Sequence, residues 1–199
     1  MAPRPLVLVH GLWDTPRLFR RLEQELQTRR PDLKLFAPHL PHGLGTVPIR
    51  ALAQQLAALI EERFGPEQRL DLFGFSMGGV IGRTWLQEHG GHRRTHRFVC
   101  LGSPQQGTLA AQLVPRWLLA GIADMKIGSD LLADLAAHTD LLSGLDCHSL
   151  YSVTDITVFP GWRAVLPLGS RRALPVYTHR QLICHPRAIR ELVDLLLAP

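Results

Sequence analysis

The 199-residue chain contains little cysteine and almost no lysine. Its three cysteines, Cys100, Cys147 and Cys184, are an odd number and show no Cys-x-x-Cys spacing. The sequence therefore indicates neither a disulfide framework nor a zinc cluster. Free thiols are typical of a reducing compartment, so we expect a cytoplasmic protein if the chain begins at its natural start.

The sequence also lacks any apolar run that is long enough to span a membrane. The first apolar run, residues 6–9, is too short for the core of a signal peptide, and a His-Gly pair follows it at once. We therefore expect no integral membrane segment. A chain from which a leader had been removed would give the same pattern.

Lys34 and Lys126 are the only lysines, so arginine carries almost all of the net charge of +5. A basic chain can bind nucleic acid or a membrane surface, but these arginines are spread over the whole sequence. The densest basic patch, residues 92–97, reads as a solvated turn and matches no nucleic-acid-binding motif. We expect no nucleic-acid partner, and the sequence leaves the oligomeric state open.

What the sequence does contain is a regular alternation of short apolar runs with helical periodicity. It predicts strands over 5–10, 33–37, 69–75, 96–102, 148–154 and 173–178. It predicts helices over 16–30, 47–65, about 77–88, and 186–198. This order is typical of βαβ units and predicts a single α/β domain over residues 1–199, with a mainly parallel central sheet flanked by helices.

Functional groups of such sheets gather where the strands end. His10-Gly11-Leu12 follows the first predicted strand, and Ser76 follows the third. Asp155 and His179 come after the fifth and sixth. We expect these residues to meet at one edge of the sheet.

Ser76 stands in the stretch Gly74-Phe75-Ser76-Met77-Gly78, between a predicted strand and a predicted helix. This is the Gly-x-Ser-x-Gly pattern of a nucleophile elbow, in which a tight turn exposes the serine. Small residues are needed because side chains would collide across the turn. We predict that Ser76 is a nucleophile; the alternative is an ordinary serine at a helix start.

A nucleophilic serine also needs an oxyanion hole, a base and an orienting acid. The N–H groups of Met77 and Leu12 are the expected oxyanion donors, with His10 holding the loop. For the base we favour His179 and keep His185 as the alternative, although a helix-capping role suits His185 better. For the acid we favour Asp155 and keep Asp146 as the alternative.

Five stretches together resemble the α/β-hydrolase superfamily, most closely its small bacterial lipases and esterases of the triacylglycerol lipase type. They are VLVHGLWDTP, GFSMGG, LGSPQQGT, SVTDITVFP and THRQLICHP. The resemblance implies His179 as the base, Leu12 as an oxyanion donor and no cofactor. Larger relatives carry calcium or zinc in insertions, but this short sequence shows no ligand set for them, so we expect no metal. The chain departs from the family where Thr178 replaces the common glycine, and where His-Gly-Leu-Trp-Asp-Thr replaces the commoner His-Gly-x-x-Gly.

The segment 105–147 contains no predicted strand and is rich in leucine. We expect it to form a small cap or lid near Ser76, or else simply to pack on the sheet. The predicted walls of the substrate pocket are apolar, which favours uncharged esters with hydrophobic acyl groups. The residues expected to line this pocket are Trp13, Phe75, Trp117 and Leu118.

The sequence thus predicts a serine carboxylester hydrolase that acts on a small-molecule ester or a lipid. A thioesterase or acyltransferase would use the same three side chains, and a non-catalytic binding protein of this fold is a third hypothesis. A fluorophosphonate probe that failed to label Ser76 would favour the third.

Overall fold

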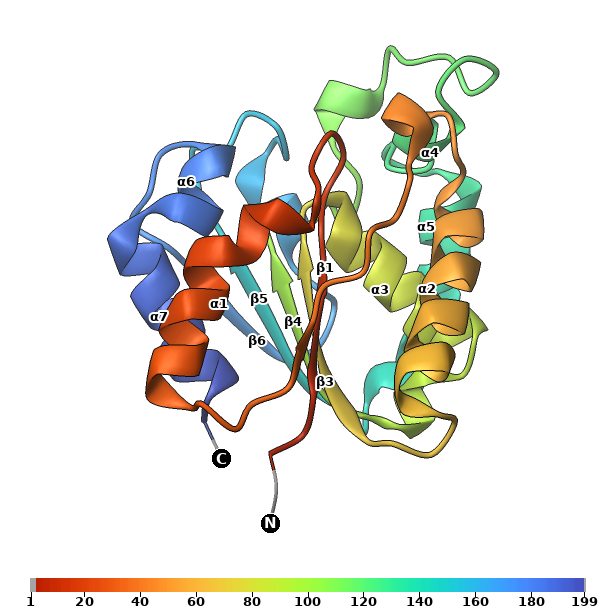
Figure 1. Ribbon diagram of the computed structural model, residues 1–199. Coiled ribbons are helices and arrows are strands. Elements are labelled where there is room, and N and C mark those ends of the chain that lie inside the picture. The colour runs from red at the N-terminus through yellow and green to blue at the C-terminus, as the bar shows by residue number, and fades with distance from the viewer. Residues whose placement is uncertain (1–2, 199) are drawn as a thin grey trace.

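The computed structural model describes residues 3–198, and in it six strands form one parallel sheet in the order β2-β1-β3-β4-β5-β6 (Figure 1). The strands are β1 Leu6–Val9, β2 Leu35–Phe36, β3 Leu70–Phe75, β4 Thr95–Leu101, β5 Asp146–Tyr151 and β6 Ser170–Ala173. The predicted α/β architecture with a parallel sheet is confirmed.

Helices cover both faces of this sheet. The helices are α1 Arg20–Arg29, α2 Ile49–Phe64, α3 Met77–Glu88, α4 Ala120–Ala123, α5 Asp130–Ala137, α6 His179–Cys184 and α7 Pro186–Leu196. Figure 1 shows α1, α6 and α7 on one side of the strands, and α2, α3 and α5 on the other. Both termini lie at the edge where the strands begin, and the loops that follow the strands lie at the opposite edge.

The central strands explain why both faces are covered. In β1, Leu6 and Leu8 pack toward α1 and α7, whereas Val7 and Val9 pack toward α2 and α3. Successive side chains of a strand point to opposite faces, so a continuous apolar run buries both. All four residues of β1 are buried, and a strand of this kind needs a helical layer on each side.

The last predicted strand was placed wrongly. We predicted it over 173–178, but β6 is Ser170–Ala173, and all four of its residues are exposed. A polar edge strand is a common way to prevent pairing with another chain. The apolar residues that suggested the strand, Leu174 and Val176, are buried instead in the cluster around α7, so packing, rather than sheet pairing, explains their pattern.

The next strand inward, β5, begins two residues before its predicted start.

The basic patch at 92–97 is not one solvated turn, as we expected. Residues 91–93 form a short 3-10 helix, and β4 begins at Thr95. Arg97 is buried within this strand and forms an ion pair with Asp146 of β5, with 2.7 Å between Nε and Oδ2. The pattern of charge alone did not reveal that the patch crosses into the sheet.

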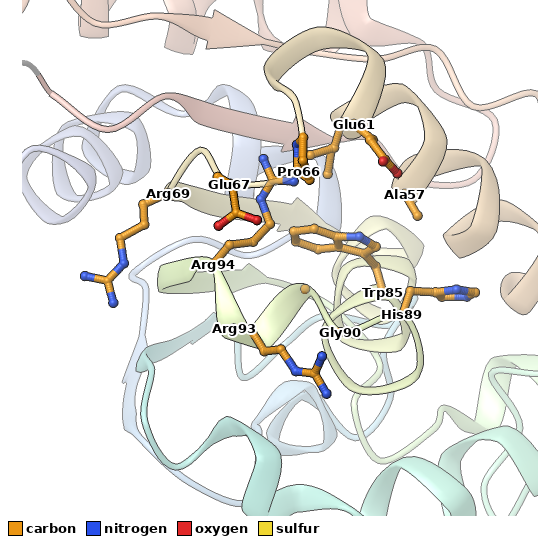
Figure 2. A pocket seen from close by; sticks show the side chains of 12 residues that line it. Ala57, Glu61, Pro66, Glu67, Arg69, Trp85, His89, Gly90, Arg93 and Arg94 are labelled. Atoms are coloured by element: carbon orange, nitrogen blue, oxygen red, sulfur yellow. The ribbon is translucent and has the colours of Figure 1, made fainter.

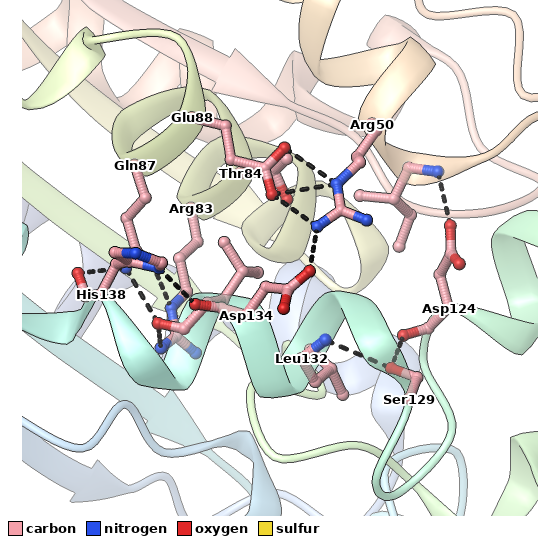
Figure 3. Close-up of polar contacts among 12 residues, drawn as sticks. Arg50, Arg83, Thr84, Gln87, Glu88, Asp124, Ser129, Leu132, Asp134 and His138 are labelled. Carbon is pink, nitrogen blue, oxygen red and sulfur yellow. Dashed lines mark hydrogen bonds and ion pairs between the residues drawn. The ribbon is translucent and has the colours of Figure 1, made fainter.

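The segment 105–147 divides into two parts. Its second part contains α5, which packs beside α2 and α3 and contributes Leu131, Leu132 and Leu135 to the core. Figure 3 shows Arg50 of α2 between Glu88 and Asp134, at 2.9 and 2.6 Å. This half therefore packs on the body of the protein, which was one of our two expectations for it.

Buried Arg83 of α3 ties both parts of that segment to the helix. Its guanidinium donates to the carbonyl oxygens of Gln105 and Leu135, at 3.3 and 2.8 Å. Burial lowers the pKa of Arg83 to about 10. The arginine thus anchors residues on either side of α4 through their carbonyl oxygens, and among residues 3–198 it has no ion pair with an acidic side chain. The first part of the segment, 105–119, lies at the edge where the strands end (Figure 1).

Candidate active site

Ser76 lies in a strained turn between β3 and α3. Its backbone has φ 54° and ψ −130°, a conformation that residues with a side chain rarely adopt. A Cβ on Gly74 would lie 2.4 Å from the Cα of Gly79, and one on Gly78 would lie 2.1 Å from the carbonyl oxygen of Val9. The glycines are needed because the turn is this tight, and the turn holds Ser76 above the start of α3.

The loop after β1 passes directly beside Ser76. A Cβ on Gly11 would lie 2.8 Å from the Cβ of Ser76, so only glycine allows this approach. Leu12 follows Gly11, and Met77 is the first residue of α3. In the described part of the chain, no hydrogen bond uses the N–H of Leu12 or of Met77. Both predicted oxyanion donors thus lie near Ser76. Met77 is the next residue in the chain, and Leu12 belongs to the loop that passes beside the serine.

Two histidines hold this loop. His10 is buried and donates from Nδ1 to the carbonyl oxygen of Gly11 at 3.0 Å, while its Nε2 accepts from the N–H of Leu40 at 3.1 Å. Burial lowers the pKa of His10, which favours the neutral imidazole that this pair of bonds requires. The N–H of Trp13 donates to Nε2 of His42 at 3.1 Å. The predicted role of His10 fits these contacts.

His42 is a contact that sequence reasoning missed. It comes from the loop 37–48 after β2, and it reaches a residue 29 positions earlier. Trp13 has a positive φ of 60°, so its conformation needs support from outside the loop. The only signal in the sequence was the closeness of two histidines to prolines and glycines after a strand, and that did not indicate a partner.

Buried Asp155 and half-buried His179 form a pair at the same edge of the sheet. Nδ1–H of His179 donates to Oδ2 of Asp155 at 2.6 Å. The other carboxylate oxygen, Oδ1, accepts from the N–H groups of Thr157 and Val158, at 2.8 and 3.2 Å. Asp155 is only 1% exposed. These bonds fix the carboxylate and assign the proton of a neutral imidazole to Nδ1, so Nε2 carries the lone pair.

His179 and Ser76 both lie against the end of β4. The N–H of Ser76 donates to the carbonyl oxygen of Leu101 at 2.9 Å. A Cβ on Gly102 would lie 3.2 Å from Cε1 of His179. The Phe75 ring lies 4.9 Å from the imidazole. No hydrogen bond joins Nε2 of His179 to Ser76; this nitrogen is buried and has no hydrogen-bond partner among residues 3–198.

We predicted that His179 directly follows a strand, but this prediction was wrong. Five residues separate it from β6, and it is the first residue of α6. Thr178 caps this helix: its hydroxyl accepts from the N–H of Gln181, and the Gln181 side chain accepts from the N–H of Thr178. The position of the imidazole is therefore set by a capping box. The alternative base, His185, caps α7 through the N–H of Arg187.

A cavity of about 630 Å³ opens beside His179. Of the predicted pocket residues, Trp13 and Phe75 line it, together with Leu12. Trp117 and Leu118 do not line it: Trp117 is 85% exposed, and both stand in the outer loop 102–119. The sequence correctly marked these two as apolar, but it carried no information on where their loop would place them.

A second cavity, of about 470 Å³, lies at the other end of α3 (Figure 2). It is lined by Trp85, with arginines such as Arg69 and Arg94 and the acidic side chains of Glu61 and Glu67 around it. Because Ser76 precedes the first residue of α3 and Trp85 lies near its end, this cavity is separate from the one beside His179.

The alternative acid, Asp146, lies at the opposite end of β5 from Asp155. Its Oδ1 is 2.7 Å from Nε2 of His148, and Nδ1 of that histidine is 2.6 Å from Oγ of Ser170. Its Oδ2 contacts buried Arg97. Asp146 is therefore a partner of His148 and Arg97 rather than of His179.

Two absences concern only residues 3–198. In this range, no cluster of three or more histidine, cysteine, aspartate or glutamate side chains is arranged to hold a metal ion. No helix in the same range is both long enough and apolar enough to cross a membrane.

Comparison with known proteins identifies the class. Residues 4–166 match the family of the α/β-hydrolase fold, and the chain belongs to this family. The resemblance drawn from the sequence motifs is thereby confirmed. No curated protein sequence matches the chain.

Solved structures with the same fold include two lipases. Bacillus licheniformis lipase BlEst2 in its mature form has a TM-score of 0.75 and 17% identity, over 98% of this chain and 92% of that chain. Aspergillus fumigatus lipase B has a TM-score of 0.78 and 18% identity, over 98% of this chain; this chain spans 52% of that lipase. The RedJ thioesterase of Streptomyces coelicolor has a TM-score of 0.64 and 21% identity, over 98% and 90% of the two chains. At these identities the likeness shows the fold alone.

Proposed function

We propose that the protein is a serine carboxylester hydrolase in which Ser76 is the nucleophile, His179 the base and Asp155 the orienting acid. The observation that carries this proposal is the convergence at the end of β4. The strained Ser76 and the imidazole of His179 both contact Leu101–Gly102, although they are 103 positions apart in the chain. A folded chain has no packing reason to hold a serine in this conformation, and strained backbone is often found at functional sites.

The reaction begins with attack of Ser76 Oγ on the ester carbonyl carbon. Nε2 of His179 takes the hydroxyl proton, and Asp155 stabilises the resulting imidazolium through the 2.6 Å bond to Nδ1. The negative charge that develops on the carbonyl oxygen is stabilised by the N–H groups of Leu12 and Met77 and by the start of α3. His179 then gives its proton to the leaving alcohol.

Water completes the cycle. It attacks the acyl-enzyme while Nε2 of His179 takes its proton, and Ser76 is released with the acid product. Among residues 3–198, no hydrogen bond joins Ser76 to Nε2 of His179. Such bonds are often long before substrate binds, and the mechanism requires this contact to form in the substrate complex.

The cavity supports an uncharged ester as substrate. Apolar side chains, including Leu12, Trp13 and Phe75, make up most of its inner wall, and the two charged groups that line it, Asp14 and Arg180, pair with each other at 3.4 Å. A hydrophobic acyl chain would lie against this wall without leaving a charge unpaired.

The proposal is tested with a fluorophosphonate probe and a series of p-nitrophenyl esters of increasing acyl length. We expect the probe to label Ser76 in the folded protein and ester turnover to rise with acyl length before it falls. Acyl-CoA compounds measured beside the esters test the thioesterase alternative. Absence of labelling at Ser76, with the fold intact, would reject the serine mechanism altogether.

A further inference from the structure

The loop that carries Asp155 and the segment that leads to His179 lie side by side beyond the end of the sheet. The ladder between β5 and β6 ends at Tyr151 and Ala173, and the N–H of Leu174 still donates to the carbonyl oxygen of Tyr151 at 2.7 Å. Past Leu174, no backbone–backbone hydrogen bond joins the two segments in the described part of the chain. Other contacts must therefore bring the imidazole to the carboxylate.

Two hydroxyl groups continue the pairing where the backbone pairing stops. Oγ of Ser152 donates to the carbonyl oxygen of Val176 at 2.6 Å, and Ser152 is fully buried. Oγ1 of Thr154 donates to the carbonyl oxygen of Tyr177 at 2.9 Å. The bond between the imidazole and the carboxylate is the next contact along both segments. The two segments are thus joined by three side-chain hydrogen bonds in sequence order.

Gln181 holds the same segment from the other side. Its Oε1 accepts from the N–H groups of Tyr177 and Thr178, at 2.8 and 3.3 Å. The backbone of Tyr177 is therefore held at both of its polar groups, the carbonyl by Thr154 and the N–H by Gln181. Because Tyr177 is largely exposed, these bonds, rather than packing, fix its position.

Helix α6 does not fix the start of the helix by itself. It has only six residues, and isolated helices of this length are not stable in water. Its buried residues, Leu182 and Ile183, lie in its second half. His179 is the first residue of the helix, so its backbone position depends on the segment before it.

We propose that three side chains position the imidazole of His179 for catalysis. They are Ser152, Thr154 and Gln181, and we call them the clasp. By fixing residues 176–178, the clasp turns Nδ1 toward Asp155 and leaves Nε2 to take a proton. A displacement of about 1 Å can lower the rate about 10²-fold, so hydrogen bonds in this segment affect turnover. The effect on turnover rests on the proposed function; the effect on the bond between His179 and Asp155 does not.

Thr154 is the best member of the clasp to change, because it is exposed whereas Ser152 is buried in the fold. Thr154→Val removes the hydroxyl group and keeps the shape of the side chain, and Thr154→Ser keeps the hydroxyl group. Thr28→Val is the matched control. Thr28 is also exposed, and its hydroxyl donates to the carbonyl oxygen of Gln24 at 2.8 Å, but it lies in α1 rather than in either loop.

Steady-state hydrolysis of a dissolved ester gives the first readout. We expect Thr154→Val to lower kcat about tenfold with KM within about twofold of wild type, because the lost bond loosens the base rather than the substrate. Thr154→Ser should recover kcat to within about twofold, and Thr28→Val should leave it at the wild-type value. An increase in KM with unchanged kcat would assign the Thr154 hydroxyl to substrate binding and overturn the proposal.

Gln181 tests the clasp from the other side. Gln181→Met removes the acceptor of both N–H groups at nearly constant size, and Gln181→Glu keeps an acceptor and the capping-box pattern. We expect about tenfold loss of kcat in the first variant and recovery to within about twofold in the second. Wild-type kcat in Gln181→Met would contradict the proposal.

Proton NMR of the Nδ1–H of His179 gives a readout that needs no substrate. A proton in a short bond between an imidazole and a carboxylate resonates far downfield, and its absence from His179→Ala identifies it. We expect this proton to exchange with water about tenfold faster in Thr154→Val than in the wild type, because the segment opens more often. Thr28→Val should not change the exchange rate.

The outcomes separate this inference from the proposed function. A wild-type protein that hydrolyses no ester, with faster exchange in Thr154→Val, would refute the proposed function and support the clasp. Lower thermal stability of Thr154→Val, with kcat and the exchange rate at their wild-type values, would give its hydroxyl a structural role only and overturn the proposal.

Discussion

Strand β5 has a histidine–aspartate pair at each end, and the two pairs have different surroundings. Beyond its carboxyl end, Nδ1 of His179 donates to Asp155 at 2.6 Å. At its amino end, Nε2 of His148 lies 2.7 Å from Asp146, and the other ring nitrogen lies 2.6 Å from Oγ of Ser170. Judged by residue types and distances alone, the amino end has the more complete serine–histidine–aspartate set.

The backbone distinguishes the two sets. Ser170 is an ordinary residue of an exposed edge strand and pairs across the ladder with His148. Ser76 is held at φ 54° at the start of a helix, beside the loop 10–15 that we propose supplies an oxyanion donor. The N–H groups of Leu12 and Met77, which we propose as oxyanion donors, belong to the loop and the helix that flank Ser76. A catalytic set is therefore defined by the turn and its N–H donors as much as by its three side chains.

The carboxylates differ in a second way. Asp155 uses its remaining oxygen to accept N–H groups of its own loop, which fixes it for one histidine. Asp146 is 40% exposed and shares its oxygens between His148 and buried Arg97. The first pair is built to orient an imidazole, and the second joins strands β4 and β5.

Substitution of each of the two serines should give the largest difference in kcat between the two sets. Ser76→Ala removes the nucleophile and should lower kcat by about five orders of magnitude, with the thermal unfolding midpoint little changed. Ser170→Ala should leave kcat at its wild-type value. Steady-state ester hydrolysis measures both. An active Ser76→Ala protein would place the nucleophile elsewhere and remove the basis of the comparison.

Variants of the histidines sharpen the comparison between the two serine–histidine–aspartate sets. His179→Ala should lower kcat by about four orders of magnitude, because no other group takes the proton of Ser76. His148→Ala and the helix-capping variant His185→Ala should retain most of the activity. The measurement is steady-state ester hydrolysis by each variant at one fixed pH, with thermal unfolding as the control for loss of fold. Loss of activity in His185→Ala alone would exchange the two assignments.

The two aspartate variants should affect different properties: Asp155→Asn should lower kcat, and Asp146→Asn should lower stability. Asp155→Asn keeps an oxygen for the loop N–H groups but loses the charge, and kcat should fall about 10³- to 10⁴-fold. Asp146→Asn should leave kcat unchanged and lower the free energy of unfolding by about 1–2 kcal/mol, because the charged contact between Asp146 and buried Arg97 is lost while the partial exposure of Asp146 limits the effect. Urea unfolding and steady-state kinetics on the same samples decide this. The reverse pattern would assign the catalytic acid to Asp146.

The smallest effect concerns acid stability. Burial opposes ionisation of Asp146, but the contacts with His148 and Arg97 outweigh it and lower the pKa of the carboxyl. An aspartate with a lowered pKa stabilises the fold above its ordinary pKa of 3.8, and this contribution is lost as pH falls through the lowered value. The difference in unfolding free energy between wild type and Asp146→Asn should therefore shrink between pH 7 and pH 3. A constant difference would mean that the charge of Asp146 has no part in stability.

Several features were predictable because they depend on local chemistry. The glycines around Ser76 have a steric meaning that holds in any chain, and the strand-to-helix context was visible in the apolar pattern. The start of α5 is another local feature: Ser129 is a residue type that commonly caps helices, and its hydroxyl accepts the N–H of Leu132. Where burial came from packing between distant segments, as at Leu174 and Val176, the same pattern led to a misplaced strand.

By itself, the sequence determined the α/β fold, the elbow at Ser76 and the loop after β1, because strand alternation, helix periodicity and the need for glycine act over a few neighbouring residues. The tertiary structure decided which carboxylate meets which imidazole, because Asp146 and Asp155 lie in the same short stretch yet at opposite ends of one strand. It also decided that Trp117 and Leu118 lie outside the cavity, on an exposed edge. Exposure depends on what the rest of the chain covers, and no local pattern contains that information.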